Sequence, residues 1–156
     1  MREQLRLLVK LQTLDLRTSE LKRFKDEPSS RIKKLEENLF QKRKEIDDIK
    51  QKVETLNKKR MEKERYLEME VEKIKKSEKR LMEIKTNKEY EALLKEIAFA
   101  KELNRDIEEE IVEIMDEIEE ANKEIAIKES NFNIQKENLE KGKIEFKSKS
   151  IQWYLF

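Results

Sequence analysis

The acidic residues that follow position 107 are the first candidates for chemistry in this sequence. Carboxylates are the ligands that hard divalent cations prefer, and six of them occupy ten positions: Glu108, Glu109, Glu110, Glu113, Asp116 and Glu117. Successive residues of a helix point in different directions, whereas a cation site needs oxygens that converge on one point. We therefore predict a solvated helix face, with no bound metal and no other cofactor.

Catalysis has little support in the composition. The chain contains no His and no Cys, and its single Gly argues against a glycine-rich phosphate loop. A catalytic acid or base also needs a concave site that perturbs its pKa. We expect no enzymatic activity. The absence of cysteine also excludes disulfides and thiolate metal sites.

Basic residues form a run that could bind RNA phosphates. We define the basic run as Lys58, Lys59, Arg60, Lys63 and Arg65. A second basic cluster follows at Lys73, Lys75, Lys76, Lys79 and Arg80. The alternative is that these side chains pair with acidic residues of a neighbouring helix, which would neutralise their field. No aromatic platform accompanies these lysines, so the pattern does not favour base-specific recognition.

The second half of the chain has apolar residues at alternating spacings of three and four. Asn104, Lys128 and Gln135 are polar interruptions, which more commonly fix the register of a coiled coil than bind a ligand. This seven-residue repeat indicates a left-handed coiled coil, and a content of 47% charged residues with one Gly and one Pro is typical of long helices. The positions of this seam are Tyr90, Leu93, Ile97, Ala100, Asn104, Ile107, Ile111, Ile114, Ile118, Ala121, Ile125, Lys128, Phe132, Gln135, Leu139, Gly142, Phe146, Lys149 and Trp153.

The first half repeats the pattern with one interruption and one unclear stretch near Arg60 and Met61. Pro28 lacks a backbone donor and disfavours helix at the residue before it, which predicts a kink or a short break, with Ser29 or Ser30 capping the next helix. The predicted seam positions are Leu7, Leu11, Leu14, Thr18, Leu21, Ile32, Leu35, Leu39, Ile46, Ile49, Val53, Leu56, Leu67, Val71, Ile74, Leu81 and Ile84.

A turn is predicted at about residues 85–87, because Thr86 followed by Glu89 forms a capping box before an apolar repeat. Residues 1–85 carry 26 Lys and Arg against 18 Asp and Glu, whereas residues 86–156 carry 11 against 18. Opposite net charges favour pairing of the two halves within one chain.

These patterns predict an all-α fold, a long antiparallel coiled-coil hairpin that forms one domain over residues 1–156. Its arms would span about residues 1–85 and 88–156. Folding about residue 86 would bring Pro28 level with Gly142 as a hinge. It would also place the basic run opposite the acidic run, and Lys141, Lys143, Lys147 and Lys149 opposite Asp26 and Glu27. A monomeric hairpin and an arm-swapped dimer would make the same contacts.

The stretch RLMEIKTNKEYEALLKEI, from Arg80 to Ile97, resembles the hairpin tip of a bacterial family. The family comprises coiled-coil proteins with a C-terminal C4-type zinc ribbon, among them a chlamydial coiled-coil protein and a helicobacter flagellar-biogenesis factor. The opening from Glu3 to Lys22, followed by Pro28, and the Glu-Ile repeat after the tip are also similar. This chain lacks the two Cys-x-x-Cys pairs of the ribbon, so no zinc ligand is carried over.

The resemblance implies a cytoplasmic adaptor that contacts the sigma-54 transcription factor and nucleic acid, in transcription or flagellar regulation. The predicted partner-binding tip comprises Thr86, Asn87, Lys88, Glu89 and Tyr90; capping, with Tyr90 on the seam, is the structural alternative. A purely structural coiled-coil spacer is the alternative function.

We expect no membrane contact and no signal peptide, because long apolar stretches are lacking. The apolar tail Ile151–Phe156 fits either a docking patch or a chain altered before a ribbon.

Overall fold

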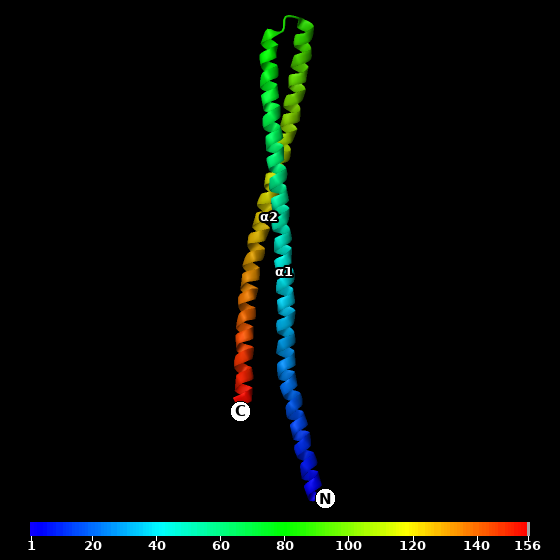
Figure 1. The fold of residues 1–156 in the computed structure, drawn as a ribbon, viewed down its shortest axis with the longest axis vertical. Helices are drawn as coiled ribbons and strands as arrows, with labels where there is room; N and C mark the ends of the chain where they lie inside the picture. The colour runs from blue at the N-terminus through cyan, green and yellow to red at the C-terminus, as the bar shows by residue number, and fades with distance from the viewer. Residues whose placement is uncertain (156) are drawn as a thin grey trace. The chain divides into compact units, whose positions relative to one another are not determined.

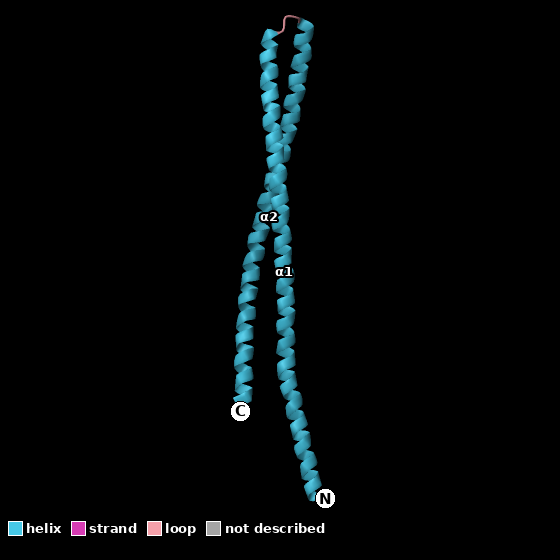
Figure 2. Ribbon diagram, in the orientation of Figure 1, coloured by secondary structure: helices cyan, strands magenta, loops and turns pink. Residues whose placement is uncertain are grey.

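The structure, a computed structural model, describes residues 1–155, and it describes no side chains at positions 24, 25 and 153–155. It contains two helices, α1 from Arg2 to Glu83 and α2 from Asn87 to Leu155, and no strand among the described residues (Figures 1 and 2). The predicted all-α class is confirmed. The seam position Trp153 and most of the tail Ile151–Phe156 lie outside the described side chains.

The connection between the helices lies one residue earlier than predicted. It comprises Ile84–Thr86, and Asn87 already belongs to α2. The carbonyl oxygen of Thr86 accepts the backbone N–H of Tyr90 at 3.1 Å, which is the first bond of the helix and puts Thr86 at the N-cap. Glu89 lies in the first turn of α2, where a negative charge is favourable beside the free N–H groups.

The helix α1 continues through Pro28 without a break. The short break that was one alternative does not form, and Ser29 and Ser30 lie inside the helix rather than at its cap. Gly142 likewise lies inside α2, and a Cβ atom built there would meet no atom within 4 Å. Neither residue ends a helix, and the predicted hinge stays a prediction.

Contacts within the chain divide it into two units. The first unit contains residues 1–45 and 128–156, and the second contains residues 46–127. In the second unit both helices contribute to a buried cluster of Ile74, Leu93 and Ile97, against which Leu81, Ile84 and Ala100 pack. In the first unit both helices again contribute buried residues, Leu39 and Leu139.

The predicted seam of α2 is confirmed over its central part. Every predicted position from Leu93 to Phe132 is buried or half-buried, including Asn104, which is 7% exposed. Beyond Phe132 the burial is incomplete, because Gln135 and Lys149 are exposed. Tyr90 is 43% exposed and therefore only partly covered.

The covered positions of α1 keep their seven-residue repeat even where the residues at those positions are polar. From Arg60 to Leu81 the half-buried or buried positions keep the alternating spacing of three and four, at Arg60, Lys63, Leu67, Glu70, Ile74, Ser77 and Leu81. The predicted seam residue Val71 is exposed, as is Met61. The prediction was wrong here because it followed apolar residue types, whereas burial follows the helical repeat even where the residue is polar.

Leu7, Leu11, Leu14 and Thr18 were also predicted seam positions, and all four are exposed. Leu35 is 49% exposed. Apart from Leu35 and Val71, the predicted seam positions of α1 are buried or half-buried from Leu21 onward but not before it. The predicted apolar repeat starts near the beginning of α1, but its first four positions are not buried.

Ile46 is the most completely buried side chain, at 0% exposure. We expect Ile46→Ala to lower the free energy of unfolding by about 2–5 kcal/mol, because three buried side-chain carbon atoms and their contacts are lost. The matched control is Ile127→Ala, since Ile127 is 64% exposed, and it should change the free energy by no more than about 0.5 kcal/mol. Urea denaturation followed by circular dichroism measures both. Equal losses in the two variants would contradict the assigned seam.

Candidate partner-contact site

The predicted tip residues lie together at the loop and the first turn of α2. Thr86, Asn87, Lys88, Glu89 and Tyr90 are all exposed. Backbone capping by Thr86 fixes where the helix starts and hence where the next four side chains lie. The structure thus places the five side chains on one short stretch that solvent, or a partner, can reach.

Met82 belongs to the same site but was not predicted. It lies in the last turn of α1 and is 92% exposed. Its position between the half-buried Leu81 and Ile84 puts it off the seam, so the repeat itself could have identified it as an exposed apolar residue. Because methionine is unbranched and polarisable, it adapts readily to partner surfaces. Met82 and Tyr90 give the tip two large, largely apolar side chains in an otherwise polar setting.

The basic run does not form one exposed face. Lys58, Lys59 and Arg65 are exposed, whereas Arg60 and Lys63 are half-buried on the seam. The Lys63 ammonium pairs with the Glu110 carboxylate. Lys58, Lys59 and Arg65 are therefore the members of the run whose side chains phosphate could reach.

Arg60 shows the cost of a basic residue on the seam. Its guanidinium Nη1 lies 3.9 Å from Glu64 Oε1 on the same helix. Its Nε atom is buried and has no hydrogen-bond partner within the described part of the chain. A side chain held in this way is a poor phosphate ligand, because its charge is already partly engaged.

Lys63 and Glu110 form the predicted contact between the basic run and the acidic run. The hydrogen bond from Lys63 and its positive charge lower the pKa of the Glu110 carboxyl below its ordinary value of 4.5, with a smaller contribution from Lys59. The acidic run thus pairs with the neighbouring helix at this point. Among the described residues no group of three or more acidic side chains is arranged to hold a metal ion.

Further polar contacts join α1 to α2 inside each unit. In the second unit Lys101 Nζ lies 3.0 Å from Glu78 Oε1. In the first unit the contacts are Lys143 to Glu36 at 2.6 Å, Lys128 to Glu45 at 3.7 Å, Lys42 to Gln135 at 2.7 Å, and Arg43 over the Phe132 ring at 5.7 Å. Lys143 thus contacts Glu36 rather than the predicted Asp26 or Glu27.

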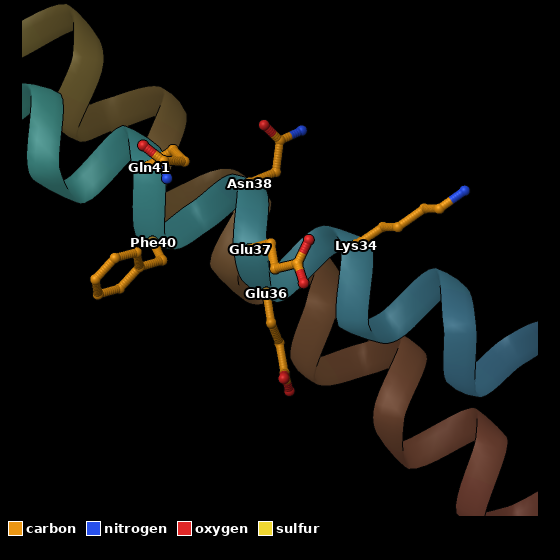
Figure 3. Close-up of a pocket in the computed structure, with 6 residues that line it drawn as sticks. All are labelled: Lys34, Glu36, Glu37, Asn38, Phe40 and Gln41. Carbon is orange, nitrogen blue, oxygen red and sulfur yellow. The ribbon is translucent and has the colours of Figure 1, made fainter.

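A hollow on the described part of α1 is open to solvent and is not an enclosed ligand site. This hollow lies in the first unit, has a volume of about 550 Å³ and is lined by Lys34, Glu36, Glu37, Asn38, Phe40 and Gln41. All six lining residues come from α1, and Figure 3 shows their side chains pointing in different directions, with the Phe40 ring turned away from Lys34. Because a single helix supplies the whole lining and its side chains diverge, polar groups do not converge on a bound molecule there.

No protein-family model, no curated protein and no solved structure matches this chain. The resemblance of the tip to the zinc-ribbon family therefore stays a prediction. Within the described residues, neither helix has a stretch long and apolar enough to cross a lipid bilayer.

The contact between Lys63 and Glu110 predicts a pH dependence of stability. The pKa of Glu110 is lower in the folded chain than in the unfolded chain, so the contact stabilises the fold above about pH 4.5. That contribution is lost as the pH falls through the lower, folded-state pKa. We expect Glu110→Gln to remove this part of the pH dependence, as read from thermal unfolding between pH 2 and pH 7.

The matched control for this prediction is Glu109→Gln, since Glu109 is an exposed neighbour on α2. It should leave the profile close to that of the unmodified chain. Identical pH profiles for Glu110→Gln and the unmodified chain would contradict the contact.

Proposed function

We propose that this chain is a non-enzymatic scaffold, an antiparallel coiled-coil hairpin that presents the tip around Thr86–Tyr90 to a protein partner. The observation that carries the proposal is the order of the contacts between the helices. Glu36, Glu45 and Glu78 contact Lys143, Lys128 and Lys101 in turn, so residue numbers rise along α1 as they fall along α2. Contacts in this order support helices that run in opposite directions, as in a helical hairpin with a short loop.

The tip supports a contact role through its exposure. Met82 and Tyr90 expose large side chains beside a loop of three residues. Aromatic and methionine side chains supply much of the binding energy at protein interfaces. The nearby apolar residues Leu81 and Leu93 are half-buried and buried on the seam. The exposure of Met82 and Tyr90 therefore distinguishes them from the apolar residues that the other helix covers.

The setting of the scaffold follows from the resemblance of residues 80–97 to the zinc-ribbon family. On that ground we propose sigma-54 as the partner to test first, in transcription or flagellar regulation. RNA binding is less well supported, because Arg60 and Lys63 of the basic run are engaged on the seam. A spacer without a partner is the alternative, and the binding experiment below separates it from the scaffold.

The hairpin itself is tested by zero-length carbodiimide crosslinking of the unmodified chain, read by mass spectrometry. The expected amide crosslinks join Lys63 to Glu110, Lys101 to Glu78, and Lys143 to Glu36, because each pair is in contact. Mixing ¹⁴N-labelled and ¹⁵N-labelled chains separates links within one copy from links between two. Links found only between copies would replace the hairpin with an arm-swapped dimer, and loss of all three would contradict the pairing.

The contact role is tested by binding of purified sigma-54 to the chain with Met82→Ser and Tyr90→Ser combined. We expect the dissociation constant to rise at least about tenfold, as for loss of interface anchor residues. The control is Phe99→Ser, because Phe99 is 65% exposed on α2 away from the tip, and it should change binding little. Circular dichroism confirms that each variant stays helical.

Biolayer interferometry on immobilised chain gives the dissociation constants. Equal weakening by the tip and control variants, or no binding of sigma-54 at all, would count against a tip that recognises this partner. Binding of fluorescent single-stranded RNA at low salt, lost when Lys58, Lys59 and Arg65 become Gln, would favour the nucleic-acid role instead.

A further inference from the structure

We infer that Met82 is a site of reversible oxidation, at which a peroxide weakens the contact that the tip makes with its partner. Sulfur occurs in this chain only in methionine, since five Met and no Cys are present. A peroxide therefore meets no thiol here, and its reaction with sulfur converts methionine to the sulfoxide. The inference rests on the proposed function in one respect, because it takes the tip around Thr86–Tyr90 to be the contact site.

The methionine side chains differ in how far solvent reaches them. Met82 is 92% exposed, whereas Met61, Met69 and Met115 are between 47% and 61% exposed. Because oxidation follows exposure, Met82 should react faster than these three, by roughly 1.5- to 2-fold. Met1 is also fully exposed, but it precedes α1 and is not part of the tip. Met82 is thus the methionine of the tip, and one of the two that solvent reaches most freely.

Oxidation at position 82 spares the pairing of the helices, because Met82 is not part of the seam. Its neighbours Leu81 and Ile84 are half-buried and pack against the buried cluster of the second unit. Met82 itself lies in the last turn of α1 and is open to solvent. The oxygen of a sulfoxide at this position is therefore hydrated, whereas a sulfoxide in a core would lose its hydration without gaining a hydrogen bond.

The same oxidation changes the surface that the tip offers to a partner. Met82 and Tyr90 are the two large, largely apolar side chains that are exposed there. Oxidation turns the flexible, apolar thioether of methionine into a polar group. A partner surface that fits the thioether then has to bury a polar oxygen, which costs binding free energy unless a hydrogen bond replaces its hydration. The modification therefore acts on association and leaves the fold intact.

The reaction needs a two-electron oxidant of the peroxide class, and hydrogen peroxide is the probe. The sulfur lone pair of Met82 attacks one peroxide oxygen, the O–O bond breaks, an S=O bond forms, and water leaves. Sulfur loses two electrons, and the peroxide is reduced by the same two electrons. A methionine sulfoxide reductase reverses the change, because two electrons and two protons convert the sulfoxide to the thioether and water.

Two variants that differ in the methionine they keep provide the test. The first carries Met61→Leu, Met69→Leu and Met115→Leu and so keeps Met82. The second, its matched control, carries Met61→Leu, Met82→Leu and Met115→Leu and so keeps Met69. Leu and Met have similar volumes, so both chains should stay folded.

The rate of oxidation is measured on the unmodified chain by peptide mapping with mass spectrometry, at timed intervals after addition of hydrogen peroxide. We expect Met82 to be oxidised faster than Met69, by roughly 1.5-fold, in the ratio of their exposed fractions. Oxidation of Met82 at the same rate as Met69, or more slowly, would overturn the inference.

The effect on the fold is measured by thermal unfolding of the variant that keeps Met82, before and after oxidation. The midpoint should move by no more than about 2 °C, as for a change at an exposed position. A larger fall would show that oxidation loosens the pairing of the helices, and it would overturn the inference.

The effect on the contact is measured with purified sigma-54, the probe of the binding experiment above. Oxidation of the variant that keeps Met82 should raise the dissociation constant at least about fivefold, through the altered anchor residue, and a methionine sulfoxide reductase should restore it. Oxidation of the variant that keeps Met69 should change it little.

The outcomes separate this inference from the proposed function. Binding of sigma-54 that is equally strong before and after oxidation of Met82 overturns the inference and leaves the proposed function standing. Equal weakening in the two variants also overturns it, because Met82 would then have no special role. Failure of sigma-54 to bind either untreated variant rejects the proposed partner, and the claimed effect on that contact falls with it.

Discussion

The alternating three-and-four spacing along both helices is the constraint on which the other features depend. A contact between two helices has one seam, and the repeat alone decides which side chains enter it. Arg60, Lys63 and Glu70 are half-buried for this reason, although each would be better hydrated elsewhere. The contact between Lys63 and Glu110 follows from that placement, as does the divided basic run.

Polar groups on the seam reduce stability and limit the ways in which the helices can pair. Asn104 is 7% exposed, and its Oδ1 atom has no hydrogen-bond partner in the described part of the chain, which costs about 1–3 kcal/mol. It lines a hollow of about 380 Å³ with Glu78 and Lys101, whose charges pair with each other. A polar seam residue of this kind disfavours a shift of one helix along the other, because each shifted register would bury it against a different layer.

The sequence was sufficient to predict the two helices, the N-cap at Thr86 and the burial of α2 from Leu93 to Phe132, because these depend on local pattern. It was insufficient at Pro28, where the lost hydrogen bond costs about 3 kcal/mol but long helix on both sides keeps α1 continuous. The net charges of residues 1–85 and 86–156 also did not predict which residues form the ion pairs between the helices. Glu36, Glu45 and Glu78 lie on α1 and pair with lysines of α2, opposite to the overall bias.

The same constraint decides which apolar side chains stay exposed to solvent. Two helices cover each other's seam only along their shared length, so apolar side chains stay exposed wherever that length ends. Large apolar side chains are exposed beside the loop, at Met82 and Tyr90, and near the start of α1, at Leu7 and Leu11. A contact at either of these ends would need no enclosed pocket and would leave the seam intact. We therefore expect substitutions at the ends to change association more than stability, and substitutions such as Ile46→Ala to do the reverse.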